Sequence, residues 1–324
     1  MNKKYISPLV PKDFIPCDWN EGDAPIEVST IKLDNYIRGD VESQLKDYLY
    51  AIMELPSSLE LKITSGSDNG LLHTISFGAF QGYKYFRMRK NDYAQVKDFA
   101  LATNLKFEQT NNNDLFSELK QETIVYFSNP CNPTCELLSP AKIETICKEN
   151  PSCLFLLDNA YIEYHQESIT TSLTELPNLV IFRTFSKFWG LAGIRLGAIF
   201  FNRNCSLAEY MGVLNSKHIS ALHDSSITEI FKRKDEIITQ RANESKNLEK
   251  LAHSIADKFN ITFKKAGNFV LLDCKDGLTK DAVNQYFFQY KIVIRDLSHL
   301  EDFEYSLRFN YRKEAFDLMM ADLI

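Results

Sequence analysis

Residues 183–197 read RTFSKFWGLAGIRLG and join two β-rich runs, 179–184 and 196–201. Before this stretch, short β-rich runs alternate with helical patterns from residue 59 onward. The earlier expected strands are Leu59–Thr64, Tyr83–Met88, Leu105–Glu108, Thr123–Phe127 and Cys153–Leu157. Strand–helix alternation predicts a mostly parallel sheet covered by helices. We therefore expect an α/β fold whose large domain holds a seven-stranded sheet.

The sequence changes character after about residue 203. Residues 224–258 are rich in Lys, Glu, Arg and Asn with spaced apolar residues, which predicts one long, solvated helix. A smaller α+β unit follows, with strands near 261–265, 269–273, 291–295 and 306–309 and helices near 279–290 and 313–322. We predict an N-terminal arm over residues 1–35, which packs with the small domain or a partner subunit. A large domain over 36–205 follows, and a connecting helix with the small C-terminal domain over 206–324 completes the chain.

Composition narrows the class of protein. The chain has 324 residues, 44% of them hydrophobic and 25% charged, which is typical of a folded globular protein. A net charge of −6 argues against a nucleic-acid or anionic-membrane partner. No apolar run approaches the ~18 residues that span a bilayer, and residues 1–11 lack the apolar core of a signal peptide. Seven cysteines without framework spacing indicate reduced thiols, so we expect a cytoplasmic protein without a metal site.

Lys187 is the residue in the opening stretch that points to chemistry. It stands among apolar and aromatic residues, which lower the pKa of an amine and favour the neutral, nucleophilic form. Thr184, Ser186 and Arg195 around it are residue types that bind phosphate. A surface lysine is the plainer interpretation, but the density of hydroxyls and cations argues against it.

Two further clusters follow expected strands, where ligands collect in α/β proteins. Residues 64–70, TSGSDNG, open a helix, so that backbone N–H groups of Ser67 and Asp68 can face an anion. Helix capping by Ser67 or Asp68 is the plainer interpretation. Residues 128–135, SNPCNPTC, form turns that proline fixes, and these orient the Asn132 amide toward a ligand oxygen. Here the plainer interpretation is a rigid turn.

A third cluster, LLDNAY, ends an apolar strand at Asp158 and places Tyr161 three residues on. A carboxylate there is costly to bury unless a cation or a donor meets it, although helix capping also suits an aspartate. Together the clusters require one phosphate, an aldehyde for Lys187, a ring nitrogen for Asp158 and a ring hydroxyl for Asn132 and Tyr161. Pyridoxal 5′-phosphate meets each of these requirements.

From about Asn20 to Arg312 the chain resembles the fold-type I pyridoxal-phosphate aminotransferases, and among them the histidinol-phosphate aminotransferases. The segments SNPCNPT (128–134), DNAY (158–161) and RTFSKFWGLAGIRLG (183–197) carry the resemblance, in the family's order and spacing. It implies a homodimer that transfers an amino group between an amino acid or phosphorylated amine and a 2-oxo acid. Threonine-phosphate decarboxylases share these cofactor residues, so decarboxylation of a phosphorylated amino acid stays open. A non-catalytic pyridoxal-phosphate-binding homologue is a third alternative.

The resemblance assigns roles residue by residue. Lys187 would form the Schiff base with the cofactor and shuttle a proton, and Asp158 would hold the ring nitrogen protonated. Asn132 and Tyr161 would bind the ring hydroxyl. The phosphate ligands would be Ser67, Asp68, Thr184, Ser186 and Arg195.

The same resemblance extends to the substrate side and to the dimer. Tyr93 would stack on the cofactor ring, and Tyr36 would reach the phosphate of the neighbouring subunit. Arg308 would bind the substrate carboxylate, and the arm Trp19-Asn20-Glu21 would contact the substrate through Asn20.

The chain departs from the family's pattern at several places, among them the stretch around Tyr83–Asp92, which is short and lacks the usual proline before the stacking aromatic. Cys135 stands where the family usually has glycine, and Asn310-Tyr311 replace a Gly-Thr pair after Arg308. These departures lie nearer the substrate than the cofactor. The resemblance therefore defines the cofactor better than the amino donor.

Overall fold

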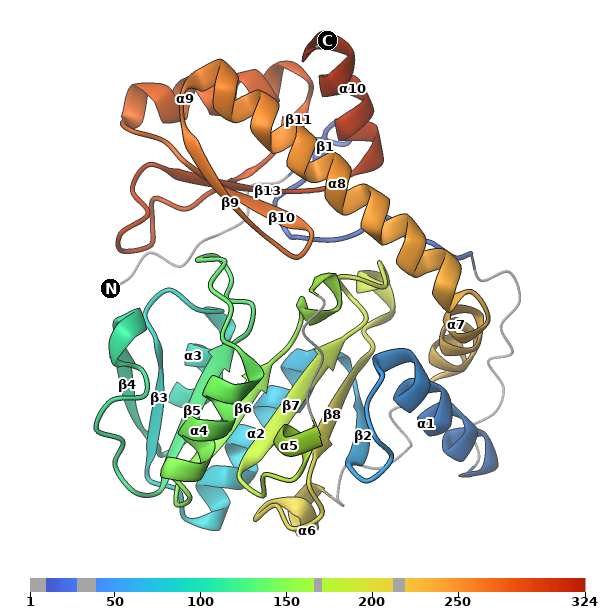
Figure 1. The fold of residues 1–324 in the computed structure, drawn as a ribbon, viewed down its shortest axis with the longest axis vertical. Coiled ribbons are helices and arrows are strands. Elements are labelled where there is room, and N and C mark those ends of the chain that lie inside the picture. The colour runs from blue at the N-terminus through green and yellow to red at the C-terminus, as the bar shows by residue number, and fades with distance from the viewer. Residues whose placement is uncertain (1–9, 28–38, 166–170, 212–218, 324) are drawn as a thin grey trace.

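A computed structural model describes residues 10–27, 39–165, 171–211 and 219–323. A large domain and a small domain lie one above the other, and the long helix α8 runs between them (Figure 1). In the described part of the chain, no helix combines the length and the apolar character that crossing a bilayer requires.

The large domain is built on one seven-stranded sheet with the order β2-β8-β7-β6-β5-β3-β4. Its strands are β2 (Glu60–Thr64), β3 (Tyr85–Arg89), β4 (Lys106–Thr110), β5 (Thr123–Ser128), β6 (Leu154–Asp158), β7 (Leu179–Thr184) and β8 (Gly197–Phe201). β8 pairs antiparallel with both of its neighbours, and the other pairs are parallel. The expected fold class, an α/β fold with a mostly parallel seven-stranded sheet, is confirmed.

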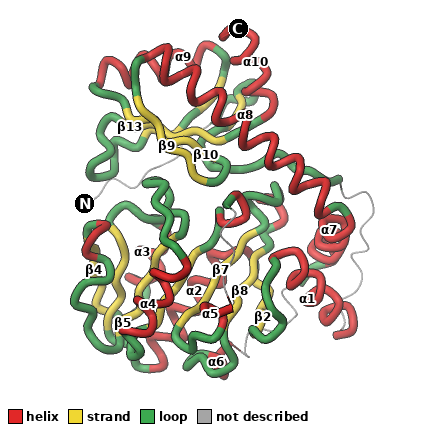
Figure 2. Tube along the Cα trace, viewed as in Figure 1, coloured by secondary structure: helices red, strands yellow, loops and turns green. Residues whose placement is uncertain are grey.

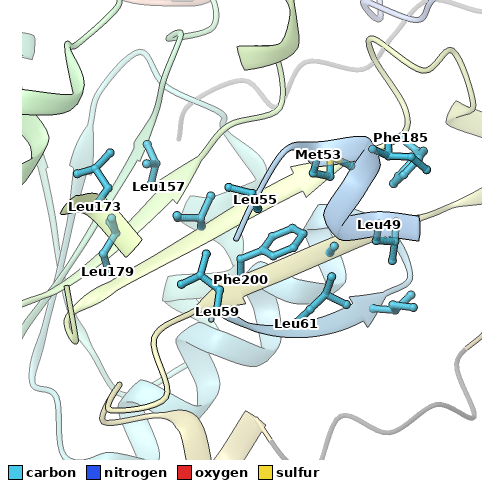
Figure 3. Packing of buried hydrophobic residues seen from close by; sticks show 14 of the residues in the cluster. Leu49, Met53, Leu55, Leu59, Leu61, Leu157, Leu173, Leu179, Phe185 and Phe200 are labelled. Carbon is cyan, nitrogen blue, oxygen red and sulfur yellow. The ribbon is translucent and has the colours of Figure 1, made fainter. Parts of the chain in front are cut away.

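Helices cover both faces of this sheet because its central strands are apolar on both sides. Even-numbered residues of β5 such as Ile124 and Tyr126 belong to one core, and odd-numbered ones such as Val125 belong to the other. The helices on the first face are α2 (Gly66–Gln81), α3 (Gln95–Leu101) and α6 (Ala208–Met211). Those on the second are α1 (Gly39–Met53), α4 (Pro140–Glu149), α5 (Thr171–Thr174) and α7 (Ala221–Lys232). Figure 3 shows this second core, where Leu49 and Met53 of α1 approach Phe200 of β8.

The small domain holds a four-stranded antiparallel sheet with the order β12-β13-β10-β9. Its strands are β9 (Thr262–Ala266), β10 (Phe269–Asp273), β12 (Arg295–Asp296) and β13 (Ser306–Asn310). Its helices are α8 (Lys234–Phe259), α9 (Gly277–Gln289) and α10 (Lys313–Leu323). Val270 and Leu272 of β10 pack on these helices, so the opposite face of the sheet, which carries Arg308, turns toward the large domain.

Two expectations for the C-terminal half are wrong in detail. The single helix expected over 224–258 is two helices, α7 and α8, because Arg233 leaves the helical conformation with φ −111° and ψ 17°. The strand expected near 291–295 is two short strands in different sheets: β11 (Ile292–Val293) and β12.

The described part of the N-terminal arm is tied to the small domain. β1 (Ile15–Pro16) pairs parallel with β11, and beyond it the chain passes over the large domain as the segment 17–25. We call residues 17–25 the strap. The backbone N–H of Asn20 donates to Asn310 Oδ1 at 2.9 Å, and Asn268 Nδ2 donates to Asn20 O at 3.0 Å.

Candidate active site

The candidate active site lies at the carboxyl ends of β5, β6 and β7, at the edge of the sheet that faces the small domain. These strands are parallel neighbours, so the segments that follow them meet at one edge. Figure 2 shows these loops between the large sheet and the small domain. Asp158 ends β6 and Thr184 ends β7, and the turn 185–190 carries Lys187.

The Lys187 amine lies between the strap and Tyr161. Its Nζ donates to Trp19 O at 2.9 Å and lies 5.9 Å from the centre of the Tyr161 ring. Burial lowers the pKa of Lys187 to about 8, and the positive charge of Arg308 acts in the same direction. The amine is therefore partly neutral near physiological pH, as a nucleophile or a base requires.

Asp158 is a buried carboxylate that is held by donors rather than by a cation. Tyr126 Oη donates to its Oδ2 at 2.9 Å, and the Ala160 amide donates to its Oδ1 at 3.1 Å. Burial raises the pKa of Asp158 to about 7, and the nearby Asp92 charge adds to this effect. Within the described ranges no lysine, arginine or histidine forms an ion pair with it. Such a site suits a cationic ring nitrogen.

Asn132, Tyr161, Arg308 and Asn20 form one hydrogen-bonded group. Tyr161 Oη accepts from Asn20 Nδ2 at 3.0 Å and from Asn132 Nδ2 at 3.4 Å. Arg308 donates from Nη1 to Asn132 Oδ1 at 2.6 Å and from Nη2 to Asp18 O at 2.8 Å. Its buried Nε has no hydrogen-bond partner among the residues that the structure describes. Burial lowers the pKa of Arg308 to about 10, so the guanidinium still carries its charge at neutral pH and suits an anion.

Hydroxyl, guanidinium and backbone N–H groups gather at the N-terminus of α2. No side chain caps this end of the helix, so its first N–H groups are available to an anion. Gly197 lies so close that a Cβ there would be 2.6 Å from Ser67 N. Arg195 reaches over the helix end, with Nη2 3.3 Å from Asp68 Oδ2. Its Nη1 donates to Ser186 Oγ at 3.5 Å, and Ser186 Oγ also accepts from Thr184 Oγ1 at 3.1 Å.

Tyr93 lies in the segment between β3 and α3 and packs, half-buried, against the core on the α2 face. Its amide donates to Asp92 Oδ1 at 2.8 Å. Burial raises the pKa of the Tyr93 phenol, and the Asp68 carboxylate at the N-terminus of α2 raises it further. The structure thus brings the predicted site residues into one region, but Tyr36 lies outside the described residues.

Cys135 occupies the position where the family usually has glycine. Its φ is +63°, in the left-handed region that favours glycine, and its amide donates to Cys131 O at 2.9 Å. The backbone at residue 135 therefore keeps the left-handed conformation that favours glycine, although the residue is a cysteine. Burial raises the pKa of the Cys135 thiol to about 12, which keeps it protonated. In the described ranges no cluster of His, Cys, Asp and Glu has the makings of a metal site.

Arg295 is a candidate that the sequence did not reveal. It lies on β12 directly opposite Arg308 on β13, and opposite residues of an antiparallel pair share one face of the sheet. Its charge contributes to the lowered pKa of Arg308. The sequence signal was weak because β12 has only two residues, and its pairing with β13 follows no local pattern.

Comparison with known proteins defines the class. Residues 64–317 match the family aminotransferase class I and II, and the chain belongs to that family. A histidinol-phosphate aminotransferase of Thermoanaerobacter sp. (strain X514) is 30% identical over 212 residues, which cover 64% of this chain and 58% of that relative. One of Francisella philomiragia is 28% identical over 290 residues, covering 82% of this chain and 77% of the relative. The match to the first of these relatives thus spans less than two thirds of its length.

Solved structures share the fold. A histidinol-phosphate aminotransferase from Sinorhizobium meliloti, in complex with pyridoxal 5′-phosphate, superposes with a TM-score of 0.75 at 19% identity, covering 95% of this chain and 89% of that one. An L-threonine-O-3-phosphate decarboxylase from Porphyromonas gingivalis gives 0.72 at 19% identity, covering 90% and 92%. Aminotransferases and a decarboxylase therefore share this architecture, and the fold does not separate the two reactions.

Proposed function

We propose that this protein is a pyridoxal-phosphate-dependent aminotransferase. The observation that carries the proposal is the placement of Lys187, Asp158 and the uncapped start of α2 around one space at the carboxyl ends of the sheet. The family of the chain and the histidinol-phosphate aminotransferases among its relatives support the same activity. When bound, pyridoxal phosphate supplies an aldehyde that captures amines and a ring that stabilises negative charge.

The residues around this space match the groups of that cofactor. Asp158 would face the ring nitrogen, because a cation there offsets the cost of its burial. Asn132 and Tyr161 would bind the ring hydroxyl, and Tyr93 would stack on the ring. The phosphate would lie on Ser67, Asp68, Thr184, Ser186 and Arg195. Tyr36 of a second copy would reach this phosphate in a homodimer.

Lys187 is the group that moves a proton during transamination. Lys187 is half-buried, its amine lies 5.9 Å from the centre of the Tyr161 ring, and its pKa is about 8. A neutral amine of this basicity takes a proton from the carbon that bears the substrate's amino group, and its conjugate acid returns one. Phe185 and Phe188, close to Lys187 in the turn, are buried in the core of the large domain, which anchors the turn that carries the amine.

The amino donor would be a phosphorylated amine of the histidinol-phosphate kind, and the acceptor a 2-oxo acid. Arg308 and Arg295 present two positive charges on one face of the small sheet, which suits a phosphate dianion better than a lone carboxylate. Because histidinol phosphate has no carboxylate, the same pair would meet its phosphate in one half-reaction. In the other half-reaction the pair would meet the carboxylates of the amino acid. We propose that the enzyme works in the cytoplasm.

A half-reaction screen tests this proposal. Wild-type protein loaded with pyridoxal phosphate is mixed with amino donors, with and without a phosphate group, and its visible absorbance is followed. We expect histidinol phosphate and glutamate to bleach the absorbance and Lys187→Ala to show none of this change. The proposal is contradicted if the wild-type protein takes up no cofactor, or if none of the donors bleaches its visible absorbance. Release of CO₂ from phosphothreonine without formation of a keto acid would establish the decarboxylase instead.

A further inference from the structure

We propose that Arg241 is a positioning residue that holds Lys187 in place. Its side chain would clamp the strap against the turn 185–190 where the two segments cross. The inference deepens the proposed function and rests on it for its catalytic meaning. Arg241 lies on α8, outside every segment that the sequence motifs singled out. Its side chain is fully buried, although α8 is otherwise charge-rich, so its position serves the interior rather than the surface.

The guanidinium joins three separate parts of the chain. Nε donates to Phe188 O at 2.5 Å, next to Lys187 in the turn, and Nη2 donates to Asp23 O of the strap at 2.6 Å. Nη1 is paired with Glu244 on α8 at 2.5 Å. A planar guanidinium can reach both carbonyls at once, whereas a lysine ammonium would hold them less rigidly. Removing it would leave two buried carbonyls without this donor.

Two glycines mark the crossing that Arg241 clamps. A Cβ at Gly190, whose φ is +66°, would lie 2.3 Å from Asp23 O and 2.5 Å from Arg241 Nη2. A Cβ at Gly22 would lie 2.9 Å from Lys187 O and 3.4 Å from Gly190 Cα. The strap and the turn therefore touch at their backbones, with no room for side chains, and the guanidinium fills the remaining space.

The clamp holds both the Lys187 amine and its hydrogen-bond acceptor. The turn carries Lys187 itself, and the strap carries Trp19 O, which accepts from its Nζ. α8 joins this region to the rest of the molecule, because Ile237 belongs to the core of the large domain and Leu248 to that of the small domain. Arg241 lies between these two residues on the helix. The arrangement thus ties the position of the Lys187 amine to the helix that bridges the domains (Figure 1).

Competitive acylation of the protein without cofactor tests the clamp. Trace acetic anhydride is applied across a pH series, and acetylation of Lys187 is measured by peptide mass spectrometry in wild type, Arg241→Lys and Arg233→Lys. Arg233 is the matched control, since it donates to Pro25 O of the strap at 2.9 Å and, among the described residues, forms no hydrogen bond to the Lys187 turn. For Arg241→Lys we expect the midpoint of labelling to move up by about one pH unit, toward that of an ordinary lysine. Pyridoxal-phosphate affinity should also fall about tenfold, an expectation that matches one lost positioning contact. Arg233→Lys should leave both unchanged.

The outcomes separate the clamp from the proposed function. A folded Arg241→Lys with the wild-type labelling profile overturns the clamp, as does an equal shift in Arg233→Lys. If Arg241→Lys does not fold, Gly190→Ala tests the same contact from the turn. It should shift Lys187 labelling in the same direction, and an unchanged profile overturns the clamp. If the wild type takes up no cofactor, the proposed function fails, but the labelling of the cofactor-free protein still decides the role of Arg241.

Discussion

Asp158→Asn is expected to stabilise the cofactor-free protein at neutral and alkaline pH while it damages cofactor binding. Asp158 is 5% exposed, and its carboxylate has hydrogen-bond donors but no cationic partner in the described structure. Asparagine has the same shape and can still accept from the Ala160 amide. Tyr126 can turn its hydroxyl to accept from the new amide group. The substitution therefore removes the buried charge and keeps most of the contacts.

The magnitude follows from the pKa of Asp158. A rise from 3.8 to about 7 corresponds to about 4 kcal/mol, which is the largest effect expected. The folded state binds this proton more tightly than the unfolded state, so the wild type loses stability as pH rises from about 4 to about 7. Above about pH 7 the loss is complete and constant. The asparagine variant carries no such charge. The amount by which its free energy of unfolding exceeds that of the wild type should therefore be near zero at pH 4 and reach a plateau above pH 7.

Urea unfolding of both cofactor-free proteins between pH 4 and pH 9 measures this difference. A stability difference that does not depend on pH, or a variant less stable than wild type at pH 8, would refute the reasoning. The same unfolding measurement with pyridoxal phosphate present gives a second comparison of wild type and variant. Its ring nitrogen can offset the Asp158 charge in the wild type but not in the variant, so the cofactor should stabilise the wild type more.

Four further predictions concern the site. Lys187→Ala should abolish the visible absorbance that pyridoxal phosphate gives the wild type, and a variant that keeps it would contradict the proposed attachment. Since the Lys187 amine has a pKa of about 8 and acts as the neutral base, the wild-type rate should fall about tenfold per pH unit below that value, and a flat pH–rate profile would exclude this role. Arg308→Ala should raise KM for phosphate and carboxylate substrates by roughly tenfold to a hundredfold, against little change for amines without either group; steady-state kinetics with matched substrates measures the ratio. Gly197→Ala places a Cβ 2.6 Å from Ser67 N and should weaken cofactor binding about tenfold or more in a protein that still unfolds cooperatively, as an equilibrium titration would detect.

Local patterns were sufficient to predict the sheet of the large domain. Its central strands β5, β6, β7 and β8 are short, fully buried and mainly apolar runs. A serine followed by proline is a typical helix start, and α4 begins at Pro140 with Ser139 Oγ accepting from Lys142 N. The break between α7 and α8 was not predictable in the same way. The charged, helix-favouring pattern continues through Arg233 without a glycine or proline to interrupt it.

Site residues were predictable where they follow strands or stand in motifs, and not where tertiary contacts assign their function. An arginine in a charge-rich helix is indistinguishable in sequence from a solvated one, and only the crossing of Gly22 and Gly190 makes Arg241 a buried contact. Arg295 depends in the same way on a two-residue strand. Long-range pairing, rather than local propensity, decides both positions.

The strap explains how a site rich in unmatched charge holds together in the described structure. Trp19 O accepts from the Lys187 amine and Asp18 O accepts from Arg308, so backbone carbonyls pair with the two cations to which the proposed function assigns chemistry. Asn310, which departs from the family's pattern, helps to hold the strap. Its side chain accepts from the backbone N–H of Asn20 at 2.9 Å and donates to Glu21 O of the strap. A glycine there, as the family usually has, would make neither bond. In the proposed function, substrate binding would exchange neutral carbonyl partners of Arg308 for anionic ones, and selectivity would follow from the gain in charge rather than from a gain in the number of hydrogen bonds.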